Sequence, residues 1–345
     1  MLGDVLDMVD STIPWFAAII GLLIAIILIL KKFNPVYSLF FGAIIGSLIG
    51  GASLVTTIDI LINGTQSIIG TAIRVLAAGM LAGVMMESGA AESIANAIVT
   101  KLGDQKAILS LALSTMIITA VGVFIPVAVL IVAPIALSVG KQTGISKIAL
   151  LTALSGGGKA GNIISPNPNT IAAANGFDLN LSSVMLAGFI PAVFGLVTAV
   201  IIANAIKNKG EMVRDRDILK QETKELMPLR KALVAPGLSI FLLLINPIGT
   251  VLKIDAIANL KIDALYILPF ASIVGTIAMG HANKISEYAS SGIKRVTDTV
   301  LILIGAGAIA GLISASDLSV QVVKVIEMIG ISGTFLAPIS GILMG

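Results

Sequence analysis

Apolar stretches separated by short polar segments recur along this 345-residue sequence. A helix of about 20 apolar residues is long enough to cross the hydrocarbon core of a bilayer. We therefore predict membrane-spanning helices at residues 13–30, 33–52, 68–87, 181–206, 233–252, 264–280 and 296–315. Residues 90–102 and 318–329 instead mix apolar and polar positions at helical spacing, and we expect the first of these to lie flat at the membrane interface. The pattern predicts an all-α polytopic membrane protein.

One further apolar segment, residues 145–174, contains a sequence that disfavours a continuous helix. Its middle, SGGGKAGNIISPNPN at residues 155–169, holds three consecutive glycines and two prolines, which weaken a helix or remove its amide donors. Backbone left unpaired at membrane depth is tolerated only where it is buried in protein or lines a polar cavity. We therefore predict a broken helix, unwound within residues 155–169, of the kind that forms the binding site of transporters.

The broken helix carries an unusual density of polar side chains for a membrane segment. The candidate substrate-binding residues are Ser155, Gly157, Lys159, Asn162, Ser165, Asn167, Asn169 and Thr170. Asparagines beside prolines also suit a turn. We favour ligand contacts because three amides and two hydroxyls exceed what a turn needs.

Residues 107–140 form an apolar run that is too long for one span and too short for two. Gly122, Pro126 and Pro134 interrupt this run. We predict a re-entrant hairpin that enters and leaves the membrane on the same side. Its tip, at Gly122, Phe124 and Pro126, is expected to bring backbone close to the substrate, with tight helix packing as the alternative role.

The lysines and arginines orient these segments, because cytoplasmic loops of membrane proteins are enriched in both. Lys31 and Lys32, the lysines that flank the hairpin, and the eight basic residues of segment 207–231 all lie inside in a single threading. The acidic N-terminus and residues 175–180 then lie outside. Arg74 is expected to extend to the outer interface, and His281 to be interfacial.

The chain also repeats itself. Residues 34–51 match residues 263–280, and residues 75–88 match residues 303–316, with Gly79 falling on Gly307 and Gly83 on Gly311 at an offset of 228. Chance similarity between glycine-rich helices is the alternative. Because the linker is cytoplasmic and the first half crosses an odd number of times, we predict inverted-topology repeats.

The repeat defines three regions. We assign residues 1–206 to the first transmembrane repeat, with the hairpin at 107–140 and the broken helix at 145–174. Residues 207–231 form the cytoplasmic linker, and residues 232–345 form an incomplete second repeat. Its C-terminal part, equivalent to the first hairpin and broken helix, is expected to be missing from this sequence.

Composition narrows the class of protein. The chain is 57% hydrophobic and 12% charged, whereas soluble domains carry roughly 25% charge. A net charge of +3, with the basic residues mainly in loops, argues against nucleic-acid binding. The sequence has no cysteine and one histidine, so it offers no disulfide, catalytic thiol or histidine-rich metal centre. We predict no catalytic residues and no metal site.

Several segments resemble one known family. LAGVMMESGAAESIANAIVTKLG, APIALSVGKQTGISKIALLTALSGG, PNPNTIAAA and LILIGAGAIAGLISAS are similar to the gluconate permease (GntP) family of the ion-transporter superfamily, over nearly the whole chain. The resemblance implies uptake of gluconate, a related sugar acid or another small organic anion by symport across a bacterial inner membrane. It also implies a multi-pass protein in the lipid bilayer, often a homodimer. A coupling proton or sodium ion is expected, and no other cofactor.

The sequence departs from that family at two positions. Asn167 stands where the gluconate permeases have a histidine, so histidine cannot carry the proton here, and Lys159 replaces a small residue in the glycine run. Lys159 is a functional candidate because ionisable groups inside a membrane segment are costly. It has three alternative roles: pairing with a substrate carboxylate, standing in for a coupling cation, or capping the carbonyls of the first half-helix.

Two other functions remain as alternatives. A cation/proton antiporter would centre its site on a membrane carboxylate, and residues 145–174 contain none. An intramembrane enzyme could use Ser155 and Lys159, which are four residues apart, as a dyad. The glycines between them argue against a shared helical face. We therefore favour a secondary transporter.

Overall fold

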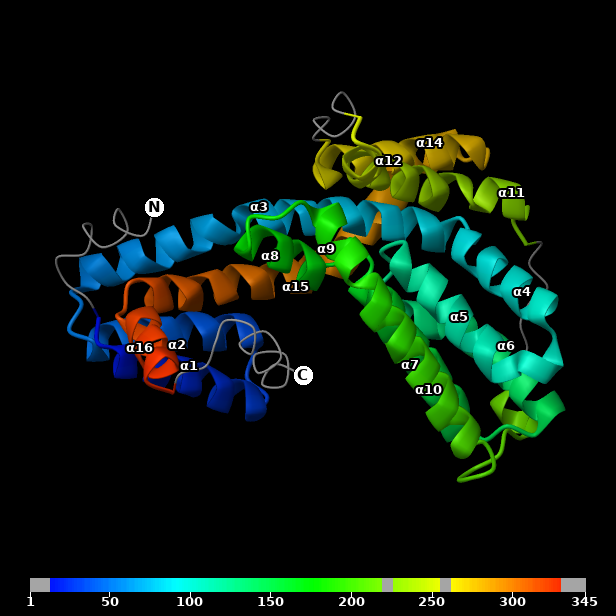
Figure 1. Ribbon diagram of the computed structural model, residues 1–345, viewed down its shortest axis with the longest axis horizontal. Helices are drawn as coiled ribbons and strands as arrows, with labels where there is room; N and C mark the ends of the chain where they lie inside the picture. The colour runs from blue at the N-terminus through cyan, green and yellow to red at the C-terminus, as the bar shows by residue number, and fades with distance from the viewer. Residues whose placement is uncertain (1–12, 219–225, 255–261, 330–345) are drawn as a thin grey trace. The chain divides into compact units, whose positions relative to one another are not determined.

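The computed structural model describes residues 13–218, 226–254 and 262–329 (Figure 1). Regular structure in these ranges is helical, apart from two isolated β-bridges that join Ile13 to Ser316 and Ser146 to Met212. The prediction of an all-α chain is confirmed for this part. The chain divides into two compact units, the first made of residues 1–72 and 298–345 and the second of residues 73–297.

Among the residues that the structure describes, three helices are long and apolar enough to cross a membrane: Leu54–Glu87, Ile125–Thr143 and Ala282–Ser314. A fourth span results if the pair Leu181–Ala187 and Phe189–Ala205, bent by 43°, counts as one. We predicted residues 181–206 as one span, and this pair covers the same residues with a bend that the sequence analysis did not predict. The helices at the predicted spans 13–30, 33–52 and 264–280 are 16, 15 and 15 residues long, which is short for a full crossing.

The first unit contains α1 (Trp15–Leu30), α2 (Pro35–Ile49), the N-terminal half of α3 (Leu54–Glu87), the C-terminal half of α15 (Ile285–Ser314) and α16 (Leu318–Ile329). Asn34 begins α2, because its side chain accepts a hydrogen bond from the Val36 amide at 2.9 Å. Small residues let α1 and α2 pack closely, and an added Cβ at Gly21 would meet the Gly42 carbonyl oxygen at 2.6 Å.

The second unit contains the remaining helices. They are α4 (Ala90–Leu102), α5 (Ala107–Ala120), α6 (Ile125–Thr143), α7 (Lys147–Ile163), α8 (Pro168–Gly176), α9 (Leu181–Ala187), α10 (Phe189–Ala205), α11 (Leu229–Ala232), α12 (Val234–Leu252) and α14 (Ala264–Ala278). Short 3₁₀ turns lie at Asp104–Lys106, Asp215–Asp217 and Ala282–Lys284. Within this unit α7 packs against α5, α6 and α10 (Figure 1).

Two helices begin earlier than predicted. Helix α3 starts at Leu54 rather than at residue 68, and α15 starts at Ile285 rather than at residue 296. Polar residues such as Asp59 in α3 and Lys294 in α15 lower the local hydropathy of these segments without ending the helix. The amphipathic segments match their predicted bounds, 90–102 for α4 and 318–329 for α16.

The predicted hairpin is present as a helix–turn–helix. Helix α5 ends at Ala120, residues 121–124 turn, and α6 begins at Ile125. Gly122 has φ of 107°, a value that favours glycine. Pro126 lies in the first turn of α6, where no amide donor is needed. Pro134 lies inside α6, so its predicted interruption is wrong. Re-entry on one side of the membrane stays a prediction.

The broken helix breaks later than its glycines suggested. Helix α7 continues through Gly156, Gly157 and Gly158 and ends at Ile163, and α8 begins at Pro168. The predicted break therefore lies at residues 164–167, inside the expected stretch. The expectation that the glycine run unwinds is wrong, because packing against neighbouring helices outweighs the low helix propensity of glycine.

The internal repeat recurs in the helix boundaries. Pro35 at the start of α2 corresponds to Ala264 at the start of α14, an offset of 229, and Ala90 at the start of α4 corresponds to Leu318 at the start of α16, an offset of 228. Asn34 and Asp263 cap equivalent helices through side-chain hydrogen bonds to Val36 and Leu265.

The repeat also recurs in glycine contacts inside each unit. In the first unit Gly64 packs against Gly307 and Gly311. In the second unit Gly292, which lies 228 residues after Gly64, packs against Gly79 and Gly83. Gly79 and Gly83 are themselves the equivalents of Gly307 and Gly311. The same contact is thus made twice, with the roles of α3 and α15 exchanged.

Candidate functional site

The short break between α7 and α8 is held by the side chain of Asn167. Its Oδ1 accepts hydrogen bonds from the backbone amides of Asn169 at 2.8 Å and Thr170 at 3.3 Å, which caps α8. Its Nδ2 donates to the Ser165 and Thr170 hydroxyls at 2.9 and 2.8 Å, and to the Asn162 carbonyl. Asn167 therefore connects the last turn of α7 to the first turn of α8.

The two hydroxyl groups beside Asn167 are buried with it. Asn167, Ser165 and Thr170 are 4%, 0% and 5% exposed. The Ser165 hydroxyl also donates to the Asn162 carbonyl at 3.0 Å. In this conformation the three side chains satisfy one another and stabilise the break. Their contact with a ligand stays a prediction.

The glycine run is the packing surface of α7. Gly157 and Gly161 lie against the backbone of α5 at Ala112 and Met116, Gly158 lies against Ile125 of α6, and Gly156 lies against Ala199 of α10. The Thr119 hydroxyl of α5 donates to the Gly158 carbonyl at 3.0 Å. Small residues at these positions let three helices approach α7 closely.

The opposite face of α7 is polar. Ser155, Lys159 and Asn162 follow one another at spacings of four and three residues, so they share one face of the helix. Lys159 is exposed, and Ser155 and Asn162 are partly exposed. Asn169, on α8, is also exposed. The expectation that the glycines would abolish a shared face for Ser155 and Lys159 is wrong. Within the described residues, no hydrogen bond joins Lys159 to Ser155 or to the last carbonyls of α7.

The hairpin tip lies beside the break. A Cβ added at Gly122 would lie 3.6 Å from Cγ of Pro166, and Ile125 contacts Gly158. Gly122 is buried, Phe124 is partly buried and Pro126 is exposed. The structure thus brings together the two elements that the sequence predicted to form one site.

Arg74 and Asp263 form an ion pair that the sequence did not predict. Arg74 Nε lies 3.1 Å from both carboxylate oxygens of Asp263, and Nη2 lies 2.7 Å from Oδ2. This bidentate contact joins Arg74 to a residue 189 positions away, and the expected extension of Arg74 to the outer interface stays a prediction. The equivalence of Asp263 with the capping residue Asn34 was visible in the repeat, but nothing in the sequence pointed to Arg74.

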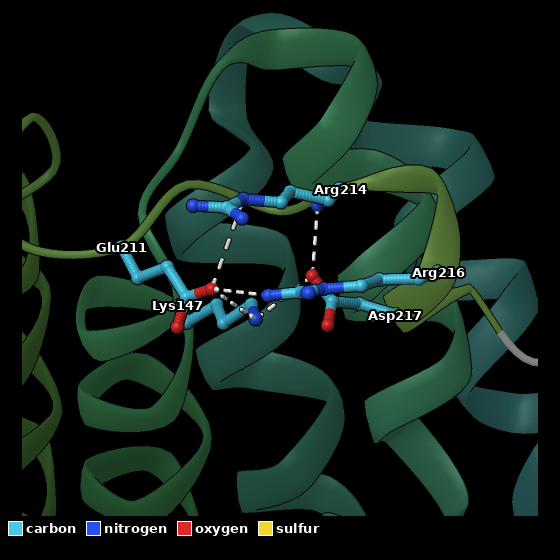
Figure 2. A network of polar contacts seen from close by, with 5 residues as sticks. All are labelled: Lys147, Glu211, Arg214, Arg216 and Asp217. Carbon is cyan, nitrogen blue, oxygen red and sulfur yellow. Dashed lines mark hydrogen bonds and ion pairs between the residues drawn. The ribbon is translucent and has the colours of Figure 1, made fainter.

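The start of the linker binds the N-terminal end of α7 (Figure 2). The Lys147 amide donates to the Glu211 carbonyl at 2.9 Å, and its ammonium lies 2.8 Å from Asp217 and 3.3 Å from Glu211. Lys141 at the end of α6 pairs with Asp215. The hydrogen bonds from Lys147 hold the pKa of the Asp217 and Glu211 carboxyls below their usual values. Part of the predicted linker is therefore folded against α6 and α7.

Metal ligands do not gather in the described ranges. Across residues 13–218, 226–254 and 262–329, no three side chains of His, Cys, Asp or Glu lie together as a metal site would require.

Comparison with known proteins gives consistent matches. The sequence model of the GntP family permease matches residues 13–344. An uncharacterized transporter of Haemophilus influenzae is 46% identical over 334 residues, which are 97% of this chain and 78% of the relative. The gluconate permease of Zymomonas mobilis is 27% identical over 52% of this chain and 41% of its own length. The D-serine transporter DsdX of Escherichia coli is 24% identical over 87% of this chain and 71% of its own length.

Proposed function

Because the chain belongs to the GntP family of permeases, we propose that it is a secondary active transporter for a small hydroxylated organic acid, such as gluconate or a related sugar acid. Relatives are named as a gluconate permease and a D-serine transporter. Those two substrates share a carboxylate with a hydroxyl group nearby. The contact between the hairpin tip and the broken helix is the observation that supports the proposal most.

The polar face of α7 is the proposed substrate site. Lys159 supplies a cation for the substrate carboxylate, and Ser155, Asn162 and Asn169 supply groups that can bind its hydroxyls. Asn167, Ser165 and Thr170 already satisfy one another, so in this conformation they hold the site in shape. If a substrate carboxylate binds the α8 amides instead, it must displace Asn167 Oδ1 from Asn169 and Thr170.

The alternation between outward and inward states is proposed to come from inverted repeats. The exchanged contacts of Gly64 with Gly307 and of Gly292 with Gly79 support this, because a pair of antiparallel, equivalent helices makes each contact twice. We propose that transport is symport with a proton or a sodium ion across a bacterial inner membrane, and that the protein is a homodimer.

A cation/proton antiporter is the second candidate. Residues 145–174 contain no Asp and no Glu, so a carboxylate that exchanges cations is lacking in this segment. An intramembrane enzyme has less support, since the family is one of permeases.

Uptake by proteoliposomes tests the proposal. Vesicles that hold the full-length protein should accumulate radiolabelled gluconate or D-serine when an inward proton or sodium gradient is imposed. Accumulation that a proton carrier abolishes would identify the proton as the coupling ion. Proton movement driven by a cation gradient, without uptake of either acid, would instead support the antiporter.

A further inference from the structure

A cavity of about 310 Å³ lies in the second unit, next to α8. Its wall is formed by α3, by the segment from α8 to α9, by α12 and by the start of α14. The polar side chains that the argument uses are Arg74, Asp178 and Asp263. Its volume falls within the range of small-molecule sites. None of the residues on the polar face of α7 lines this cavity, so it is separate from the proposed substrate site.

The charged pair in the cavity has the geometry of carboxylate recognition. Nε and Nη2, on one edge of the Arg74 guanidinium, hold both oxygens of Asp263, which is a bidentate arrangement that arginine makes with carboxylates. The two side chains are 28% and 36% exposed, so a solute in the cavity can reach them. Asp263 also accepts a hydrogen bond from the Leu265 amide at 2.8 Å, and it keeps this partner if Arg74 is removed from it.

The cavity and the break are joined by one short helix. Asn167 caps α8 at its N-terminal end, and Ile171 and Ala174 of the same helix line the cavity. At 1.5 Å per residue, Ala174 lies roughly 10 Å along the helix from the break. The loop charges predict that Arg74 and residues 175–180 lie on the outer side of the membrane. Two predicted outer segments and Asp263 therefore meet around one polar cavity.

We propose that this cavity is an outer docking site for the transported acid, in which the substrate carboxylate replaces the carboxylate of Asp263 on Arg74. The inference rests on the proposed function. Binding exchanges one bidentate carboxylate on Arg74 for another, and Asp263 still accepts the hydrogen bond from the Leu265 amide that caps α14. Asp178 places a second acidic group at the cavity wall, so the site should accept a monocarboxylate with hydroxyl groups and reject a dicarboxylate.

Kinetics of uptake in proteoliposomes test this site, with radiolabelled gluconate or D-serine as probe, whichever the unmodified protein takes up. Arg74→Gln should raise KM at least tenfold with little change in the maximal rate, because docking precedes translocation. Asp263→Asn keeps a helix cap and removes the competing charge, so KM should fall or stay equal. Arg295→Gln is the matched control. Arg295 forms an ion pair with Glu87 at 3.1 Å, and neither residue lines the cavity, so the KM of this variant should be unchanged.

The outcomes separate the two proposals. If the unmodified protein transports one probe and Arg74→Gln leaves KM unchanged, the docking site is wrong and the proposed function stands. If Arg74→Gln and Asp263→Asn raise KM equally and the exchanged pair, Arg74→Asp with Asp263→Arg, restores it, the pair is structural and the docking site is also wrong. If the unmodified protein takes up neither probe, the proposed function fails, and the docking site fails with it.

Discussion

Replacing Asn167 by alanine should destabilise the protein, because this one side chain holds the break between α7 and α8. The change removes an N-cap, which costs about 1 kcal/mol. It also leaves buried hydroxyls of Ser165 and Thr170 without the amide that now donates to them, and each buried group that loses its partner costs about 1–3 kcal/mol. The hydroxyls can rotate to nearby carbonyls, so we expect a total loss on the order of 2–4 kcal/mol.

The neighbouring residue provides the control. Asn169 is exposed and lies two positions later, at the start of α8. Asn169→Ala should change the free energy of unfolding by less than about 0.5 kcal/mol, as surface substitutions usually do. Asn167→Asp keeps the oxygen that caps α8 and loses the amide donor, so its stability should lie between those of the unmodified protein and Asn167→Ala.

Thermal and denaturant unfolding in detergent would measure this series, together with uptake of gluconate or D-serine. Loss of stability in the order Asn167→Ala, Asn167→Asp, Asn169→Ala would support a structural role for Asn167. The reasoning is refuted if Asn167→Ala is as stable as Asn169→Ala. Equal stability with lost uptake would mean that the amide contacts substrate rather than the protein.

Three further predictions follow from the same unit. Gly161→Ala should lower the free energy of unfolding by about 1–3 kcal/mol, because its Cβ would overlap the Met116 carbonyl of α5. Gly195→Ala, whose Cβ would lie 3.9 Å from Ala160, should be neutral or stabilising. Unfolding curves that coincide for the two variants would contradict this. Lys159→Met should abolish binding of the organic acid and leave the melting temperature unchanged, with Lys101→Met as the exposed control; intact binding would remove Lys159 from the site. Folding lowers the pKa values of the Asp217 and Glu211 carboxyls. Their ion pairs therefore stabilise the folded linker fully at a pH above the unfolded-state pKa values, which are about 4. This stabilisation is lost as the pH falls through the lower pKa values of the folded state. Proteolysis of residues 207–217 should therefore increase below about pH 4, and Lys147→Met should make it nearly independent of pH. Equal cleavage at pH 3 and pH 6 in the unmodified protein would argue against a stabilising role for these ion pairs.

The sequence predicted those features that depend on local pattern. The bounds of α4 and α16, the turn at Gly122 and the presence of a break before Pro168 all follow from periodicity, glycine and proline, which act over a few residues. The second half of the repeat was predictable because α14 and α16 keep the offset of α2 and α4.

Long-range partners were not predictable from the same pattern. The glycines of α7 disfavour a helix in isolation, and only the backbones of α5 and α10 beside them show why they are there. Arg74 and Asp263 are 189 residues apart, and no local signal joins them. The N-terminal part of α3 lies outside the predicted span because hydropathy measures a preference for lipid, whereas helix formation depends on backbone hydrogen bonds.

The polar residues at and near the break fall into two classes, those that can bind substrate and those that hold the shape of the site. A side chain that binds substrate must exchange partners in each transport cycle, so a group that is buried and already satisfied is better suited to holding shape. The buried, already satisfied side chains are those of Asn167, Ser165 and Thr170. The side chains that can exchange partners are those of Ser155, Lys159, Asn162 and Asn169. The glycine face of α7 makes this division possible. Close contact of the glycines with α5, α6 and α10 fixes the helix, and the face of Lys159 stays exposed. We therefore expect a substitution on the open face to alter the choice of ligand without disturbing the break.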